Sequence, residues 1–171
     1  MGLIEARVRE DGSCELYDLQ DRTSVAEWSS VAEWAQAWIN EWRTEDFDVA
    51  SEFAHAVTEE GGPHAIEVLL TLARATDGDV GDLGLVGAGP LEDLISHEGH
   101  GLRLLDEIET AARREPLFAR AMTSVWLAAD VPETVRRRLA IFGARDFVAE
   151  QAMSLEELTR YRADRFGRGW S

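Results

Sequence analysis

The chain has 171 residues, of which 45% are hydrophobic and 29% are charged, a composition typical of globular rather than disordered proteins. The net charge of −16 argues against direct binding to nucleic acid or to an anionic membrane, because both need clustered basic side chains. The single cysteine, Cys14, excludes an internal disulfide. There is no long apolar run and no signal-peptide core, so we expect a single cytoplasmic domain over residues 1–171.

The charge is unevenly distributed along the sequence. Residues 1–110 contain 25 acidic residues and 6 arginines, whereas residues 111–171 contain 8 acidic residues and 11 arginines. Such a dipolar molecule attracts cationic partners and speeds their encounter. A high net charge also serves solubility alone, and the sequence leaves both interpretations open.

The N-terminal residues 1–22 predict a β-hairpin appendage. Residues 3–9 and 13–19 are short runs rich in β-favourable side chains, and Asp11-Gly12 between them is a common hairpin turn. An isolated hairpin is only marginally stable, so we expect it to pack against the helices that follow.

Residues 24–143 predict a helical body. Two near-repeats, at 24–29 and 30–35, each begin with Ser-x-x-Glu, the capping box that starts a helix. One capping box is enough, so either a helix runs from about 25 to 43, or a short turn at 25–29 precedes a helix from 31. Further helices of about 10–15 residues are indicated by apolar stripes and by the prolines at positions 63, 90, 116 and 132.

The remaining segments complete the expected fold. The glycine-rich residues 81–89 predict a connecting loop, and the capping box at Ser154 predicts a last helix as far as about Phe166, within a C-terminal segment of residues 144–171. The fold class is therefore mainly α, with seven to eight helices as a bundle or short α-solenoid and a short N-terminal β-hairpin.

The stretch AGPLEDLISHEGHG at 88–101 carries a resemblance to a known family. With Ile-Glu at 108–109, Ala-Ala-Arg at 111–113, Glu-Pro-Leu-Phe at 115–118 and Val-Trp at 125–126, it resembles a bacterial domain family of unknown function with a Gly-Pro-Leu-Glu-Asp-Leu-Leu motif. The resemblance covers about residues 34–140 and departs at HEGHG, where the family has a shorter His-Gly. It implies an all-helical fold and supplies no catalytic residues. Toxin neutralisation is a role that suits such small bacterial proteins, by analogy alone.

Four tryptophans fall within a short stretch rich in glutamate: Trp28, Trp34, Trp38 and Trp42. The last three share one stripe of a helix, and a continuous helix would place Trp28 on the same face. Tryptophan fills protein cores and is also enriched at binding hot spots, so the stripe is either core or a partner surface. As a surface, together with Glu33 and Glu41, it would suit an arginine- or lysine-rich ligand.

Two carboxylates stand side by side within the 87–101 segment. On a helix the adjacent Glu92 and Asp93 point about 100° apart, which is poor geometry for acting on one substrate. Capping of backbone amides, or pairing with an arginine such as Arg113 or Arg114, is the simpler interpretation. Contact with a partner is the third.

The histidines of the same segment, His97 and His100, are weak candidates for a metal site. They are three residues apart, a spacing that can hold a metal ion within a helix, but Gly99 interrupts it. They could equally form a polar turn or a pH-sensitive contact surface, since histidine titrates near neutrality.

We therefore expect a non-enzymatic, acidic protein-binding module, for example an immunity or antitoxin-type protein that neutralises a basic effector. The expected contacts come from the four tryptophans and from Glu33, Glu41, Glu92, Asp93 and His97. We expect a basic protein as partner, and no cofactor, metal, nucleic acid or membrane. The alternatives are a small enzyme with its site at 87–101, using Glu92, Asp93, His97 or His100, and an oligomeric structural protein that uses the tryptophan face.

Overall fold

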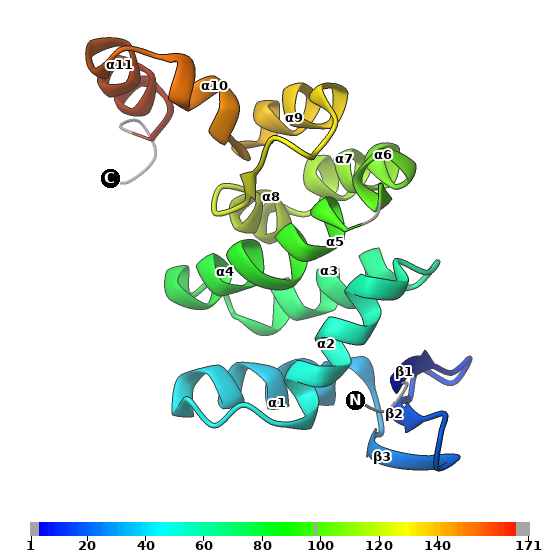
Figure 1. The fold of residues 1–171 in the computed structure, drawn as a ribbon. Helices are drawn as coiled ribbons and strands as arrows, with labels where there is room; N and C mark the ends of the chain where they lie inside the picture. Colours follow the sequence, from blue (N-terminus) through cyan, green and yellow to red (C-terminus); the bar gives the residue numbers. More distant parts are fainter. Residues whose placement is uncertain (1–3, 98, 167–171) are drawn as a thin grey trace.

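The computed structural model describes residues 4–97 and 99–166, with side chains as far as residue 160. Its helices are stacked in successive layers, from a small sheet beside α1 at the N-terminal end to α11 at the other end (Figure 1). The prediction of a mainly α fold is confirmed. The helices are shorter and more numerous than the seven to eight expected.

The N-terminal sheet consists of three antiparallel strands in the order β1 (Ile4–Val8), β2 (Cys14–Asp18) and β3 (Thr23–Trp28). The expected hairpin forms, with Val8 paired to Cys14. The prediction for residues 24–28 is wrong, because they form a third strand rather than a helix or turn. Pairing with β2 satisfies the backbone groups that the first Ser-x-x-Glu would otherwise cap, and the sheet therefore extends beyond residue 22.

The first helix starts at the second capping box. The Ser30 hydroxyl accepts a hydrogen bond from the Glu33 amide at 3.1 Å, and the Glu33 carboxylate accepts from the amide and hydroxyl of Ser29 at 2.7 and 2.6 Å. The helices of the N-terminal half are α1 (Val31–Thr44), α2 (Val49–Glu60), α3 (Ala65–Ala75) and α4 (Val80–Val86).

The second half is built from shorter segments. They are a π-helical turn (Gly87–Leu91), α5 (Glu92–Ser96), α6 (His100–Arg103), α7 (Leu105–Arg114), α8 (Pro116–Met122), α9 (Glu133–Leu139), a 3-10 turn (Ala140–Phe142), α10 (Phe147–Ala152) and α11 (Leu155–Phe166). A small parallel sheet joins β4 (Trp126–Leu127) to β5 (Arg145–Asp146). Pro116 begins α8 as expected.

The glycine-rich residues 81–89 are not a loop, and this prediction is wrong. They form most of α4 and the start of the π-helical turn, and Pro90 lies inside that turn instead of opening a helix. The cause is close packing: a Cβ atom on Gly87 would lie 2.1 Å from the carbonyl oxygen of Ala121 in α8. Glycine at 87 therefore permits two helical segments to approach each other, rather than forming a turn.

A continuous hydrophobic core connects the layers. Its largest buried side chains are Leu16, Trp34, Trp38, Ile39, Phe53, Leu69, Leu72, Leu83, Leu91, Leu94, Ile95 and Phe118. Cys14 is also fully buried, and this burial raises the pKa of its thiol to about 12.

A buried ion-pair network joins α7 to α9. The Glu109 carboxylate of α7 accepts hydrogen bonds from Arg138 at 2.6 Å and from Arg113 at 2.7 Å, and these guanidinium groups lower its pKa to about 2.

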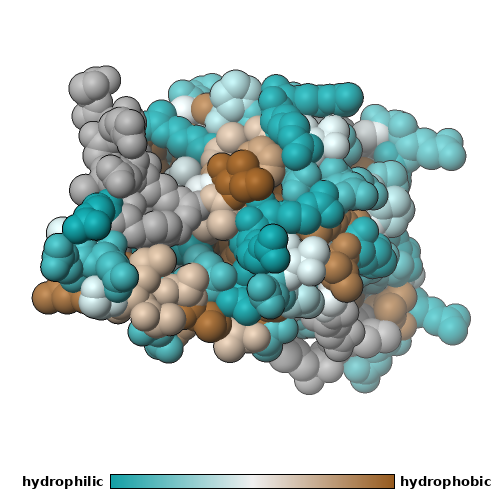
Figure 2. All heavy atoms as spheres, turned by 90° about the horizontal axis from the view of Figure 1, so that it is seen from above, coloured by the Kyte–Doolittle hydropathy of each residue, from teal (hydrophilic) through white to brown (hydrophobic). Residues whose placement is uncertain are grey.

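The face at the top of Figure 1 is mostly hydrophilic, with hydrophobic side chains in small separate areas (Figure 2). In the described ranges, no helix combines the length and apolarity required to cross a membrane.

At the start of α11, the Ser154 amide donates to Glu157 and the Glu157 amide donates back to the Ser154 hydroxyl, as the capping box predicts.

Gly87→Ala should lower the free energy of unfolding by about 2 kcal/mol or more, because the added methyl group meets backbone that cannot move independently. Gly84→Ala in the neighbouring turn is the matched control. Its Cβ would meet nothing closer than 3.7 Å, so the substitution should be neutral or mildly stabilising. Urea unfolding followed by tryptophan fluorescence measures both, and equal effects of the two variants would contradict the packing described for Gly87.

Candidate functional site

The four tryptophans do not share one surface. Trp34 and Trp38 are 0% and 2% exposed, so of the two interpretations of the stripe, the core applies to these residues. Trp28 lies in β3 and meets the ring of Phe53 edge-on at 5.4 Å. Trp42 is half-buried. Because Trp34 and Trp38 are buried, they are not available as the tryptophan face of an oligomer interface.

An aromatic and acidic surface nevertheless forms at the turn between α1 and α2. The rings of Trp42 and Phe47 meet edge-on at 4.7 Å, and Phe47 is 54% exposed. Beside Phe47 lie three exposed acidic residues, Glu45, Asp46 and Asp48, with no ion pair to any described residue. We call these five residues the aromatic–acidic patch. Sequence reasoning missed Phe47, although an aromatic residue flanked by three acidic residues is a signal for an exposed aromatic side chain.

The patch rests on a fixed frame. The indole of Trp34 donates a hydrogen bond to the Ala50 carbonyl at 3.0 Å. The Glu41 carboxylate accepts from the Ala50 and Ser51 amides, both at 2.9 Å, and so satisfies the first turn of α2. Glu41, expected as a partner contact, is thus engaged within the fold. Glu33 is exposed, and its hydrogen bonds from Ser29 lower its pKa.

Residues 1–110, the acidic part of the chain, contain six arginines, and four of them form ion pairs with carboxylates. The ion pairs are Arg7 with Glu5, Arg9 with Glu15, Arg43 with Asp82, and Arg74 with Glu115. The exposed acidic residues of this part that form no ion pair with a described residue are Glu10, Asp11, Asp21, Glu33, Glu45, Asp46, Asp48, Glu52, Glu60, Glu67, Asp77, Asp79, Asp93 and Glu107. The surface therefore keeps a surplus of negative charge after the internal pairing.

A small pocket of about 220 Å³ lies between α2 and α5. It is lined by His55, Thr58, Glu59, Asp93, Ser96 and His97. Asp93 and His97 were both expected as site residues, and the structure brings them together. Sequence reasoning missed His55 and Glu59, whose ring nitrogen Nε2 and carboxylate oxygen are 3.2 Å apart. Asp93 is exposed, but partial desolvation of its carboxyl group raises its pKa, an effect that His55 and His97 partly offset.

Glu92 and His100 do not line this pocket. The Glu92 carboxylate accepts a hydrogen bond from the Trp126 amide at 2.7 Å, which ties α5 to β4, and burial raises its pKa. The buried His100 ring has Nδ1 3.2 Å from the Thr58 carbonyl oxygen and lies 5.3 Å from the His97 ring. Hence the four candidates at 87–101 do not act as one set.

Glu92 and Asp93 do not pair with Arg113 or Arg114, the arginines that the sequence suggested as partners. Arg113 pairs with Glu109, and Arg114 lines a different groove. Among the side chains described, those of residues 4–97 and 99–160, no three from His, Cys, Asp or Glu are arranged to hold a metal ion, so His97 and His100 find no third ligand there.

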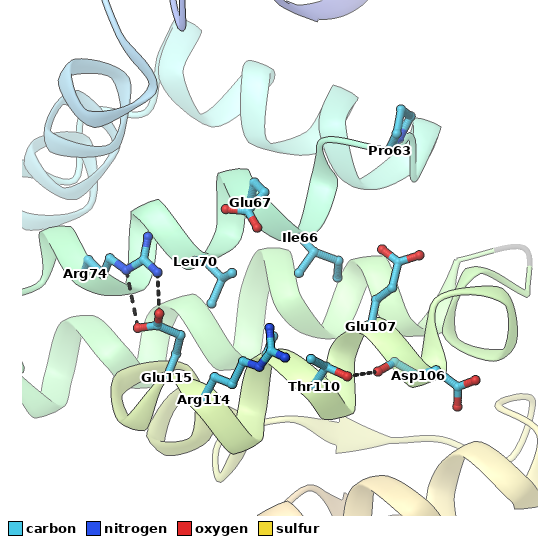
Figure 3. A pocket seen from close by; sticks show the side chains of 11 residues that line it. Pro63, Ile66, Glu67, Leu70, Arg74, Asp106, Glu107, Thr110, Arg114 and Glu115 are labelled. Carbon is cyan, nitrogen blue, oxygen red and sulfur yellow. Dashed lines mark hydrogen bonds and ion pairs between the residues drawn. The ribbon is translucent and has the colours of Figure 1, made fainter.

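The groove lined by Arg114 has a volume of about 460 Å³ and separates α3 from α7 (Figure 3). Ile66 and Leu70 supply apolar lining. Figure 3 shows Glu67 and Arg114 on opposite walls, and the Arg74–Glu115 pair bridging the groove at one end. Because its walls carry charges of both signs, the groove does not extend the acidic surface.

The fold and the site together define a mainly α protein with an N-terminal sheet, a surplus of surface carboxylates and a small histidine–carboxylate pocket. Within that class, the chain belongs to a family of unknown function (DUF6869), whose model matches residues 32–146. The match contains the aromatic–acidic patch and the α2–α5 pocket, whereas the three-stranded sheet and α10–α11 lie outside it. No curated protein and no solved structure matches the chain.

Phe47→Ala should change the free energy of unfolding by less than about 1 kcal/mol, because the ring is more than half exposed. Trp38→Ala should cost about 3–5 kcal/mol, because it opens a cavity in the core. Urea unfolding, followed by circular dichroism, compares the two. A Phe47→Ala variant as unstable as Trp38→Ala would contradict the assignment of Phe47 to the surface.

Proposed function

We propose that the protein is a non-enzymatic binding module whose acidic surface engages a basic protein. The observation that carries the proposal is the surplus of exposed carboxylates that remains although Arg7, Arg9, Arg43 and Arg74 are each paired with a carboxylate. A basic partner would meet complementary charge, which speeds association and favours correct orientation. Neutralisation of a basic effector in the cytoplasm, in the manner of an immunity protein or antitoxin, is the form of binding we favour.

The aromatic–acidic patch is the part of this surface best suited to a specific contact. Charge alone gives attraction without register, whereas a partly exposed aromatic ring can bury apolar area and meet a guanidinium group face-on. Phe47 offers such a ring between Asp46 and Asp48. Binding energy at interfaces concentrates in a few residues of this kind, surrounded by polar groups.

The proposal is tested by co-purification of the tagged protein from a lysate of the organism that encodes it, at about 50 and about 500 mM salt. The expected result is one stoichiometric basic protein, identified by mass spectrometry, that is retained at low salt and released at high salt. Exposed charges are screened over this range, so release follows from the physical basis of the proposal.

Variants locate the contact. Asp46→Arg/Asp48→Arg should lose the partner at low salt. Glu133→Arg/Glu156→Arg changes the net charge equally, at exposed positions in the C-terminal part, and should retain it. A partner held equally well at both salts and by both double variants would contradict an electrostatic contact at the patch.

A second candidate function is a small enzyme with its site in the α2–α5 pocket. The observation that favours it is the meeting of Asp93 and His97 with a second histidine–carboxylate pair, an arrangement suited to acid–base chemistry. Activity screening with His97→Ala tests it. Loss of a measured activity without loss of stability would support the enzyme.

A further inference from the structure

The two walls of the α2–α5 pocket carry matching sets of side chains. From α2 come His55, Thr58 and Glu59, which share one face of that helix because they are three and four residues apart. From α5 come Asp93 and Ser96, and His97 follows as the C-cap residue with extended backbone. Each wall therefore contributes an imidazole, a hydroxyl-bearing side chain and a carboxylate.

Both carboxylates of the pocket lie near imidazole rings rather than arginines. Glu59 is 3.2 Å from His55, and Asp93 interacts with both His55 and His97. Neither carboxylate forms an ion pair with an arginine among the described residues. With neutral imidazoles, the pocket therefore holds two negative charges and lacks the cation that would balance them.

The inner side of the pocket is closely packed. His100 is buried behind it, with Nδ1 3.2 Å from the carbonyl oxygen of Thr58. Gly61, with φ of 56°, lies directly against the same ring, where a Cβ atom would be 2.3 Å from Nδ1. This packing joins the end of α2 to α6 and gives the pocket a shape formed before a ligand arrives, which lowers the entropic cost of binding.

The pocket also continues the acidic surface. Asp48, Glu52, His55 and Glu59 follow one another at spacings of four, three and four residues, and all are exposed. Such spacing gives one stripe along α2, which runs from the aromatic–acidic patch to the pocket. A protein lying along this stripe would reach both.

We propose that the α2–α5 pocket receives the guanidinium head of one arginine of the basic partner, with Asp93 and Glu59 as its acceptors. The volume of about 220 Å³ is below the roughly 300–1,000 Å³ usual for small-molecule sites, and it suits a single side-chain head. Arginine presents several donors in a fixed plane, which matches carboxylates on two facing walls. The inference rests on the proposed function, because the arginine belongs to the protein partner.

The test uses N-acetyl-arginine amide as the probe and the full-length, 15N-labelled protein. Long-range 1H–15N spectra of the histidine side chains follow the titration at pH 7.5. We expect saturable shifts of His55 and His97, with a dissociation constant in the millimolar range. N-acetyl-citrulline amide, which is similar in shape but uncharged, should shift neither ring.

Variants separate the pocket from nearby charge. Asp93→Asn/Glu59→Gln should weaken binding of the probe about tenfold or more, whereas Glu60→Gln/Glu67→Gln, exposed and outside the pocket, should not. Asp93→Asn alone gives the same comparison with the His55–Glu59 pair intact. No saturation up to about 50 mM probe, equal shifts with citrulline, or wild-type binding by the pocket variants would each overturn the inference.

Its failure is distinguishable from failure of the proposed function. A basic partner that still co-purifies with Asp93→Asn/Glu59→Gln at unchanged salt dependence overturns the arginine site and leaves the acidic module standing. The opposite result is saturable binding of the arginine probe in the pocket, together with no basic partner in the co-purification at any salt. It would support the arginine site and overturn the proposed binding module.

Discussion

The hydrogen bond from the Trp34 indole to the Ala50 carbonyl fixes the junction on which the functional surface depends. At the same junction, Glu41 accepts from the first amides of α2, so both ends of the α1–α2 turn are held. The turn between them must then face solvent, and it carries Phe47 with its acidic neighbours outward. The exposure of an aromatic ring among carboxylates thus follows from how the core closes around Trp34.

Charge acts in two ways in this protein. Glu109, buried between Arg113 and Arg138, joins α7 to α9 and contributes to the fold. The surplus carboxylates of the acidic part have no such partners, and their mutual repulsion destabilises the compact state. A basic protein lying along α2, from Asp48 to Glu59, would relieve that repulsion. The proposed binding would thus exchange some stability of the free protein for attraction to a basic protein.

Local sequence signals predicted the elements they control directly. Capping boxes at Ser30 and Ser154 and the proline at 116 mark true helix starts, because cap chemistry involves neighbouring residues alone. The strand at 23–28 was missed because it depends on pairing with β2. The glycine-rich residues 81–89 were misinterpreted because Gly87 is constrained by Ala121, far along the chain. Periodicity placed Trp34 and Trp38 on one face, but it could not say that this face is interior.

The candidate site shows the same division. Asp93 and His97 lie four residues apart and could be selected from the sequence as one group. His55 and Glu59 belong to α2 and reach them through tertiary packing, which no local pattern reveals. Glu92 could not be separated from Asp93 by type or position. Packing against Trp126 decides that it holds α5 to β4 instead of lining the pocket.

Site-specific photo-crosslinking in a lysate of the cells that encode the protein directly tests binding of a basic protein at the aromatic–acidic patch. A photoreactive phenylalanine analogue at position 47 places the probe at the centre of the aromatic–acidic patch, and the same analogue at Ile141, 79% exposed, is the control. The account predicts a crosslink from position 47 to one basic protein, lost when salt is raised before irradiation of the lysate, and none from position 141. No crosslink from position 47, or the same products from both positions, would contradict it.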